Sequence, residues 1–349
     1  MADLGIPVAV DDVTPNWLAV VLDAPVIGVE SLAAHSGTTG RLRVALTYAD
    51  DAARPRSVFV KLPPFDERQR RFVDITGLGV AEAIFYRDLA RSVPLRVPDV
   101  YYAATDDDGR YIMVLEDLVA SDGRFPRMED DDIAALTGRI VTELGHLHAQ
   151  YWEQPVLTAE LGWLTEGNRQ AFAGGGSFIG RALERFGDDM PPVFGRLARL
   201  YTKEAPGIAE LYARGPHTLV HGDPHLGNLF VDGDRPGFYD WGMVMRRTGM
   251  WDVAYVLCNG LPPEVRRTHE HEWIASYRET LAGGGIEFDE SLAWEQYRLF
   301  AVYAWSSATS TAGVGSRWQP EDYGRHGMKA ATTAVDDLDS VDLLESLLA

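Results

Sequence analysis

The sequence predicts an α+β fold with two lobes, one built on an antiparallel β-sheet and the other mostly helical. The first observation is a set of short β-like runs, separated by Gly- and Asp-rich turns, in the first third of the chain. The second is a change after Leu118, beyond which long helical patterns dominate. The chain has 349 residues, 46% of them hydrophobic, which is enough for one large domain or for two lobes. We therefore expect a front lobe at 1–116 and a rear lobe at 117–349.

The front lobe is expected to begin with a short helix at 11–23, capped by Thr14 or Asp12 and with Pro15 in its first turn. Alternating apolar residues and polar turns then predict an antiparallel meander, followed by a helix and a hairpin. The turn DDDGR at 106–110 joins the two strands of that hairpin. The expected strands and helix cover 26–36, 41–50, 57–64, 79–93, 99–107 and 111–118.

The rear lobe is expected to be helical for most of its length. A long amphipathic pattern covers 131–152, and the chain beyond Pro263 again has mostly helical spacing. The β signal returns only in three short runs near the middle of this lobe. These runs lie at 218–221, 228–232 and 236–240.

Composition excludes several classes of partner. The formal net charge of −20 disfavours non-specific binding to nucleic acid or to anionic lipid, since both would be repelled. Cys258 is the single cysteine, which excludes an intrachain disulfide and fits a reducing compartment. The N-terminus lacks the pattern of a signal peptide, and no stretch approaches the roughly 20 apolar residues of a membrane span. We expect a cytoplasmic protein without nucleic-acid or membrane partners, and its oligomeric state stays open.

The stretch HGDPHLGN at 221–228 places polar and ionisable groups between two apolar edges, and YDWG follows at 239–242. Short strands and the turn between them would bring Asp223, Asn228 and Asp240 into one cleft. Mg²⁺ prefers oxygen ligands, which an Asn and an Asp can supply, and a second carboxylate can accept the proton of an attacking hydroxyl. Protein kinases use this arrangement, with an Asn five residues after the catalytic Asp and a later metal-binding Asp before a glycine.

This combination of motifs resembles the aminoglycoside phosphotransferase and choline kinase superfamily, and more narrowly the bacterial branch related to ecdysteroid kinases. The resemblance extends over most of the chain and implies a protein-kinase-like fold. It also implies transfer of the γ-phosphoryl group of ATP, with GTP left open as the nucleotide, to a hydroxyl of a small-molecule acceptor. By this resemblance Asp223 is the catalytic base, and Asn228 and Asp240 hold Mg²⁺. His221 supports the catalytic loop through hydrogen bonds, and His225 has a supporting role.

Lys61 ends the strand-like run VFVK, where a lysine is usually just solvated. Kinases, however, place a strand lysine on the α- and β-phosphates and pair it with a helix glutamate. Glu82, on the following helix, matches that glutamate in order and type, and the run AEAIFY fits the family pattern. We favour the nucleotide-binding role for both residues, although a solvent-facing helical glutamate is common.

Two further segments are expected to contact the nucleotide. The turn SGTTGR at 36–41 lies between two strands and precedes Lys61 by about one hairpin. Its backbone N–H groups can bind phosphate oxygens in that position. An ordinary hairpin turn is nearly as good an interpretation. The run VLEDL corresponds to the hinge between lobes, where Glu116 and Leu118 would meet the adenine edge through their main chain. The candidate phosphate-binding residues of the turn are Gly37, Thr38, Thr39 and Gly40.

Asp252 begins an apolar helix in GMWDVAYVL, and its plain interpretation is an N-cap. The resemblance assigns it instead to tying down the catalytic loop, and the two roles are compatible. The sequence does not identify the acceptor, and the resemblance leaves open an antibiotic, a sugar, a sterol or a hydroxyacyl compound. The aromatic-rich segment 297–318 either lines an acceptor pocket or packs the rear lobe, and a polycationic acceptor would need acids such as Glu264, Glu270 and Glu272 near it.

Two rival functions remain. The element GDPH at 222–225 also occurs in metallophosphoesterases, but these hydrolases need further clusters, and no Gly-Asn-His exists in the chain. A non-catalytic nucleotide-binding protein with a kinase-like fold is the second alternative. The presence of candidate base, metal and lysine residues argues against it, and a phosphotransfer or ATPase assay discriminates the two.

Overall fold

The computed structural model describes residues 5–164, 169–314 and 321–349, and its contacts divide the chain into two compact units. Unit 1 comprises the chain up to Arg124 together with Phe230–Val244, and unit 2 comprises Phe125–Leu229 and Met245–Ala349. The expected lobe boundary after residue 116 stays a prediction. Among the described residues, every helix is too short or too polar to cross a membrane.

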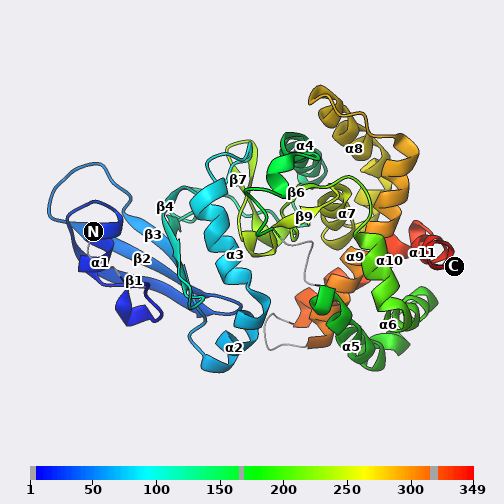
Figure 1. The fold of residues 1–349 in the computed structure, drawn as a ribbon, viewed down its shortest axis with the longest axis horizontal. Helices are drawn as coiled ribbons and strands as arrows, with labels where there is room; N and C mark the ends of the chain where they lie inside the picture. Colours follow the sequence, from blue (N-terminus) through cyan, green and yellow to red (C-terminus); the bar gives the residue numbers. More distant parts are fainter. Residues whose placement is uncertain (1–4, 165–168, 315–320) are drawn as a thin grey trace. The chain divides into compact units, whose positions relative to one another are not determined.

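Unit 1 is built on a five-stranded antiparallel sheet with the strand order β1-β2-β3-β5-β4 (Figure 1). Alternate residues of β2 point into the core, as a strand with one covered face requires, whereas β5 is buried along its whole length. The register places Arg41 of β2 directly opposite Lys61 of β3. The five strands are β1 (Val26–Ser36), β2 (Gly40–Tyr48), β3 (Ser57–Leu62), β4 (Val100–Thr105) and β5 (Tyr111–Glu116).

Three helices belong to the first segment of unit 1, namely α1 (Pro15–Val21), α2 (Glu67–Thr76) and α3 (Leu78–Ile84). Of the two expected caps for α1, Thr14 is the one observed, because its side chain accepts a hydrogen bond from the N–H of Trp17. The helix α3 continues into a π-helical turn at Phe85–Leu89. The expected helix at 79–93 therefore changes type after Ile84 and ends at Leu89.

The second segment of unit 1 carries β7 (Leu229–Asp232), β8 (Arg235–Phe238) and a short 3₁₀ turn at Trp241–Met243. Trp241 is fully buried and stacks on Phe85, with ring centroids 4.0 Å apart and planes inclined by 8°. This aromatic pair ties the residues after Asp240 to the helix that carries Glu82.

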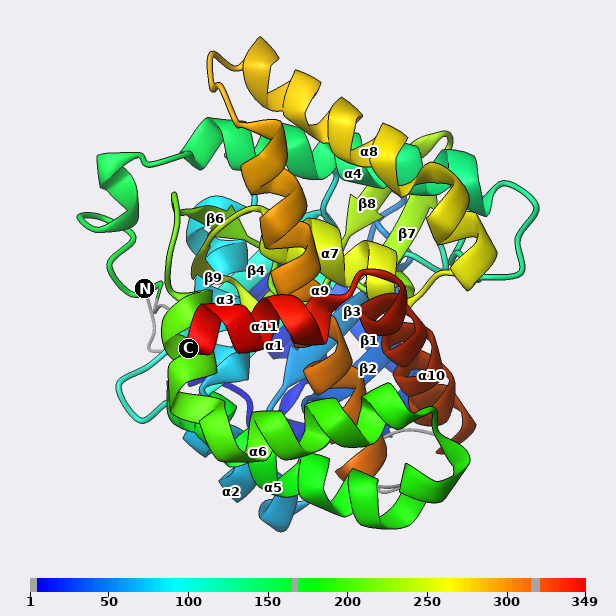
Figure 2. The same cartoon turned by 90° about the vertical axis from the view of Figure 1, so that its right-hand side faces the viewer.

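Unit 2 is mostly helical (Figure 2). Its central helix α9 packs against α5, α7 and α10, and five successive residues of α9, 301–305, are all buried. A helix with neighbours on several sides needs such apolar residues around most of its circumference. The helices are α4 (Ile133–Tyr151), α5 (Arg169–Phe186), α6 (Pro192–Tyr212), α7 (Met250–Asn259), α8 (Pro263–Gly283), α9 (Glu290–Val314), α10 (Glu321–Asp337) and α11 (Ser340–Leu348).

A two-stranded antiparallel sheet of β6 (Thr218–Val220) and β9 (Met245–Arg247) lies in unit 2. The loop 221–228 leaves the end of β6, and α7 begins soon after β9. The predicted α+β class is confirmed by the antiparallel sheet of unit 1 and the helices of unit 2.

Candidate active site

The loop 221–228 is fixed in unit 2 by the carboxylate of Asp252, which lies in the first turn of α7 and is fully buried. Its Oδ2 accepts a hydrogen bond from the N–H of His221 at 2.7 Å, and its Oδ1 accepts one from the N–H of Gly222 at 2.9 Å. His148 of α4 lies 3.4 Å from the same Oδ2 and 2.9 Å from the hydroxyl of Tyr277. Asp252 therefore orders the start of the loop.

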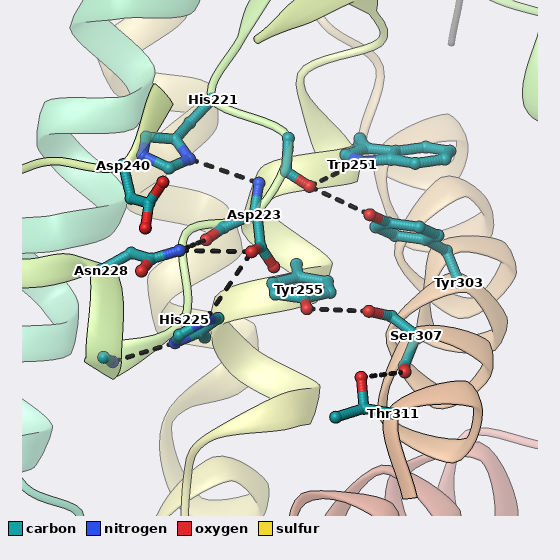
Figure 3. A network of polar contacts seen from close by, with 12 residues as sticks. His221, Asp223, His225, Asn228, Asp240, Trp251, Tyr255, Tyr303, Ser307 and Thr311 are labelled. Carbon is teal, nitrogen blue, oxygen red and sulfur yellow. Dashed lines mark hydrogen bonds and ion pairs between the residues drawn. The ribbon is translucent and has the colours of Figure 1, made fainter. Parts of the chain in front are cut away.

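Two aromatic side chains bind a main-chain carbonyl group of the same loop (Figure 3). The indole N–H of Trp251 and the hydroxyl of Tyr303 both donate to the carbonyl oxygen of Gly222, at 3.3 and 3.0 Å. Their rings stack with centroids 3.6 Å apart. Gly222 has φ of +88°, a backbone conformation that a side chain would strain. The backbone just before Asp223 is thus fixed by both its N–H and its C=O groups.

Asp223 and Asn228 lie together at the far side of this loop (Figure 3). The Asn228 Nδ2 donates to the main-chain oxygen of Asp223 at 2.9 Å and to its Oδ2 at 3.2 Å. His225 Nε2 lies 3.7 Å from the same Oδ2, and His225 Nδ1 accepts from the N–H of Gly227. His221 Nδ1 accepts from the N–H of Asp223 at 3.3 Å. All four expected loop residues of unit 2 therefore meet in one network.

A second cluster lies in unit 1, where Lys61 contacts two acidic residues. Its Nζ lies 2.6 Å from the Glu82 carboxylate and 3.0 Å from Asp240 Oδ1. Arg41 lies 3.1 Å from the other oxygen, Asp240 Oδ2. The side chains of Lys61 and Glu82 are 4% and 1% exposed, so this pair is removed from water. Three segments far apart in the sequence thus contribute to one charged cluster.

Burial raises the pKa of Glu82 to about 7, opposed by the positive charge of Lys61 and assisted by the negative charge of Asp240. A buried carboxylate is costly when it is ionised without a partner. The Lys61–Glu82 ion pair is therefore complete only where the pH keeps Glu82 deprotonated.

Asp240 and Asn228 both offer oxygen atoms suited to Mg²⁺. Asp240 has φ of +63°, an uncommon conformation for a residue with a side chain and one that often marks functional sites. Its two carboxylate oxygens contact Lys61 and Arg41, and a carboxylate oxygen has more than one lone pair with which to accept. The Asn228 amide nitrogen faces Asp223, which leaves its carboxamide oxygen to bind a cation. Taken singly, each of the two residues offers an oxygen donor of the kind that hard divalent cations bind. Because Asp240 belongs to unit 1 and Asn228 to unit 2, their joint action stays a prediction.

Three of the four candidate phosphate-binding residues form the turn between β1 and β2, and the fourth, Gly40, begins β2. The N–H of Gly37 donates to the carbonyl of Thr39, and the buried Thr39 hydroxyl accepts from Arg41 Nε at 3.3 Å. A Cβ at Gly40 would lie 2.5 Å from Phe65 and 2.7 Å from the carbonyl of Pro63. Thr38 is half-buried in this turn. The backbone therefore makes a close approach at Gly40 that excludes any side chain.

Glu116 is the last residue of β5, Leu118 follows two residues later, and both side chains are buried. The Glu116 carboxylate binds Arg96 through both oxygens, at 2.9 and 2.8 Å, and also accepts the N–H of Asp99. Its side chain is therefore part of the scaffold, so any contact with a nucleotide base would involve the main chain, as expected. Between them, Asp117 binds Arg43 at 2.9 and 3.0 Å.

A cavity of about 330 Å³ opens beside Asp223 within unit 2. The loop residues His225 and Gly227 line it together with α7, α9, α10 and the segment 126–129. The aromatic-rich segment 297–318 contributes Ser307, Ala308 and Thr311, whereas its residues 315–318 lie outside the described residues. A hollow of this size next to a candidate base can admit a small acceptor.

Comparison with protein families gives a match over residues 39–299 to the phosphotransferase enzyme family. The chain belongs to this family. Sequence comparison with curated proteins gives no match. The predicted membership of the aminoglycoside phosphotransferase and choline kinase superfamily is thus confirmed, and the chain is a phosphotransferase.

Solved structures with the same fold agree with this assignment. A provisionally assigned aminoglycoside phosphotransferase from Ralstonia eutropha JMP134 has 15% identity and a TM-score of 0.57, over 93% of this chain and 97% of that one. Choline kinase from Cryptosporidium parvum Iowa II has 10% identity and a TM-score of 0.53, over 92% and 93%. The GDP complex of aminoglycoside 2'-phosphotransferase-IIIa has 15% identity and a TM-score of 0.53, over 92% and 96%. The phosphotransferase therefore has the predicted protein-kinase-like fold.

Several residues of the two clusters were not anticipated from the sequence. In the sequence, Arg41 cannot be told from any other arginine of a strand. The strand register shows that it lies opposite Lys61. Trp251 and Tyr303 resemble ordinary core residues, although the neighbour of Trp251 in sequence, Asp252, was a useful signal. His148 lies in the long amphipathic pattern 131–152, where nothing in the sequence points to its contact with Asp252.

Proposed function

We propose that this phosphotransferase is an ATP- and Mg²⁺-dependent kinase that phosphorylates a hydroxyl group of a small molecule. The observation that carries the proposal is Lys61, which lies between Glu82 and Asp240 in the arrangement by which kinases bind nucleotide phosphates. The solved structures with the same fold include a choline kinase and aminoglycoside phosphotransferases, whose names describe small-molecule acceptors.

In the proposed reaction, Asp223 orients the acceptor hydroxyl and accepts its proton. The hydroxyl oxygen forms a bond to the γ-phosphorus of ATP while the bond from that phosphorus to the β–γ bridging oxygen breaks. ADP leaves with the electron pair of the broken bond, and the proton on Asp223 passes to solvent. The hydrogen bonds of Asn228 and His221 fix the position of Asp223, which favours a productive orientation.

The nucleotide-binding side chains would come from unit 1. Lys61 would bind the α- and β-phosphates, oriented by its ion pair with Glu82. Arg41 supplies a second cation beside the turn of Gly37, Thr38, Thr39 and Gly40, whose N–H groups would meet phosphate oxygens. The main chain at Glu116 and Leu118 would contact the base of ATP, and GTP is the alternative nucleotide.

Asn228 and Asp240 are the residues that would hold Mg²⁺, which neutralises charge on the phosphate oxygens when it is bound. The Asp240 carboxylate, which lies against Lys61 and Arg41, would supply the ligand from unit 1. Asp252 would act as a positioning residue, since it contacts the loop backbone rather than any reacting atom.

The two rival functions have less support. Phosphoesterases bind metals through clusters of His and acidic residues. Within the described part of the chain, no group of three or more His, Cys, Asp or Glu residues is placed to hold a metal. A non-catalytic binding protein would not require a carboxylate fixed by as many contacts as Asp223 has.

The test is an assay of ADP release and of phosphoryl transfer from ATP, with Asp223→Asn as the critical variant. Loss of the base should lower turnover by about 10²–10⁴-fold, while the affinity for ATP stays within about threefold. Asp234→Asn, in an exposed turn of unit 1, is the matched control and should behave as the unaltered protein. An Asp223→Asn protein with full turnover and weakened ATP binding would contradict the proposed role.

A further inference from the structure

The cavity beside Asp223 contains little net charge, which restricts the acceptor. Of its described lining residues, Arg127, Glu129 and Asp223 are the ones that carry a formal charge at pH 7 with histidine neutral. The formal charges of Arg127 and Glu129 cancel, so Asp223 carries the remaining negative charge of these lining residues. The chain as a whole has a net charge of −20, and its excess of acids is therefore not concentrated here.

The acids that would suit a polycationic acceptor lie elsewhere. None of Glu264, Glu270 and Glu272 is among the described lining residues of this cavity. Glu270 is buried and binds Arg266 and the hydroxyl of Tyr297, so its charge is already matched. Several ammonium groups that leave water need several carboxylates in return, because a partly buried charge without a partner is costly.

The floor of the cavity carries neutral groups that can both donate and accept hydrogen bonds. Tyr255 and Ser307 share a hydrogen bond of 3.0 Å, and the hydroxyl of Thr311 donates to the carbonyl of Ser307 (Figure 3). Burial, followed by the negative charge of Asp223, raises the pKa of Tyr255 well above its usual value, so the phenol stays neutral. Such hydroxyl groups recognise hydroxyl and ether oxygens of a ligand.

Two small residues, Gly327 and Ala308, line the cavity and leave space in it. A Cβ at Gly327 of α10 would lie 3.0 Å from the side-chain oxygen of Asn259 and 3.8 Å from Ala308. The carboxamide of Asn259 thus lies at the wall of the cavity and adds a further neutral donor and acceptor. The cavity volume of about 330 Å³ lies at the lower end of the range of roughly 300–1,000 Å³ for small-molecule pockets. Such a cavity suits a small ligand, such as a monosaccharide or a similar polyol.

We propose that the acceptor is a neutral, polyhydroxylated compound of about monosaccharide size. One hydroxyl would be phosphorylated at Asp223, and another oxygen of the same molecule would be bound by Tyr255, Ser307 and Asn259. This inference rests on the proposed kinase function and gives its substrate class. It excludes a polycationic amino sugar as the preferred acceptor.

The test compares two acceptor series on the full chain with ATP and Mg²⁺. One series contains neutral monosaccharides and cyclic polyols, and the other contains aminoglycosides with several amino groups, such as kanamycin. ADP release should rise with members of the neutral series and not with the aminoglycosides. Stimulation by aminoglycosides alone would overturn the substrate class while leaving the kinase function intact, and so would ATP hydrolysis that no neutral acceptor stimulates. A chain that neither binds nor hydrolyses ATP would refute the proposed function itself.

Variants of the cavity add an independent readout. Tyr255→Phe should lower kcat/KM for the neutral acceptor about tenfold, as expected for the loss of one hydrogen bond. Ser307→Asp should lower kcat/KM for the neutral acceptor and raise that for an amine-bearing analogue of the same size, because it adds a carboxylate to the floor. A purely structural role of Ser307 would weaken both acceptors alike, and that result would overturn the proposal.

Gly327→Leu should fill the cavity and raise KM for the acceptor at least tenfold, with ATP still bound. The matched control is Gly283→Leu, at the end of α8, where no atom lies within 4 Å of an added Cβ. The control should keep the KM of the unaltered chain. Acceptor kinetics in Gly327→Leu that equal those of the control would show that the cavity is not the acceptor site.

Discussion

Lys61 lies 3.0 Å from Asp240, although 179 residues separate them in the chain. The contact joins the third strand of the sheet to the segment that follows β8, and both belong to unit 1. Asp240 also binds Arg41, so two cations share one carboxylate. Substitution of Arg41 or of Glu82, the partners of Asp240 and Lys61, can therefore test the proposed role of each side chain in nucleotide binding.

Arg41→Met should raise KM for ATP about tenfold and change kcat little. The substitution keeps much of the apolar stem but removes a cation that lies beside the candidate phosphate turn and Asp240. Steady-state kinetics with varied ATP check this. Arg54→Met is the matched control, because Arg54 pairs with Asp50 on the surface of the same unit and should leave KM unchanged. An equal KM in both variants would exclude Arg41 from nucleotide binding.

The pH dependence of kcat/KM for ATP should show a limb with an apparent pKa near 7, the value to which burial raises Glu82. Activity should rise with pH through this value, because the ion pair with Lys61 needs an ionised Glu82. Glu82→Gln should lower activity and remove the limb. A limb that persists in this variant would assign the titration to another group.

Stability should change with pH in the opposite direction. Because the folded pKa of Glu82 exceeds its unfolded value of about 4.5, the folded protein binds the extra proton. The stabilisation from this group is complete below pH 4.5 and is lost as the pH rises through about 7. Chemical unfolding of the nucleotide-free protein should show a change of up to about 3 kcal/mol that is absent in Glu82→Gln.

Asp252→Asn should lower kcat by about tenfold or more and leave KM for ATP nearly unchanged. The variant loses the charge that accepts two hydrogen bonds from the backbone of His221 and Gly222, so Asp223 is less well positioned. A loss of about 1–3 kcal/mol in the free energy of unfolding should accompany it. Asp289→Asn, which affects an exposed capping contact, is the control for both measurements. An unchanged kcat would show that the loop does not depend on Asp252.

Gly40→Ala should destabilise unit 1 by about 1–3 kcal/mol, since the added Cβ would overlap Phe65 and the carbonyl of Pro63. Gly37→Ala in the same turn has its nearest atom at 3.8 Å and should stay within about 0.5 kcal/mol. Thermal unfolding compares the two. Equal stability of both variants would mean that the turn relaxes freely and does not need a glycine at position 40.

Much of the sheet and of the loop at 221–228 was predictable, because alternating residues and dense motifs are local signals. Lys61, Glu82 and Asp240 were found from their order along the chain and the resemblance to a family. Arg41 was not, since only the strand register places it opposite Lys61. The stacking of Trp241 on Phe85, which joins two distant segments of unit 1, has no signature in either segment.

The acceptor cavity was the least predictable part. Its lining comes from the segment 126–129, the loop and three helices, so no short motif describes it. Glu264, Glu270 and Glu272 were candidates for a cationic acceptor because they are acidic and lie in the rear part of the chain. Their absence from the described lining depends on which faces of α8 and its neighbours are turned inward, and residue type alone does not determine that.

Unit 1 is assembled from two segments of the chain, and this has a consequence for synthesis on the ribosome. The residues up to Arg124 emerge first, but Asp240 and Trp241 follow more than a hundred residues later. Until then Lys61 and Glu82 lack one member of their cluster, and Phe85 lacks its stacking partner. The newly made front segment must therefore remain incomplete while α4, α5 and α6 are translated. A ribosome stalled before Asp240 would carry a chain in which this charged cluster is not assembled.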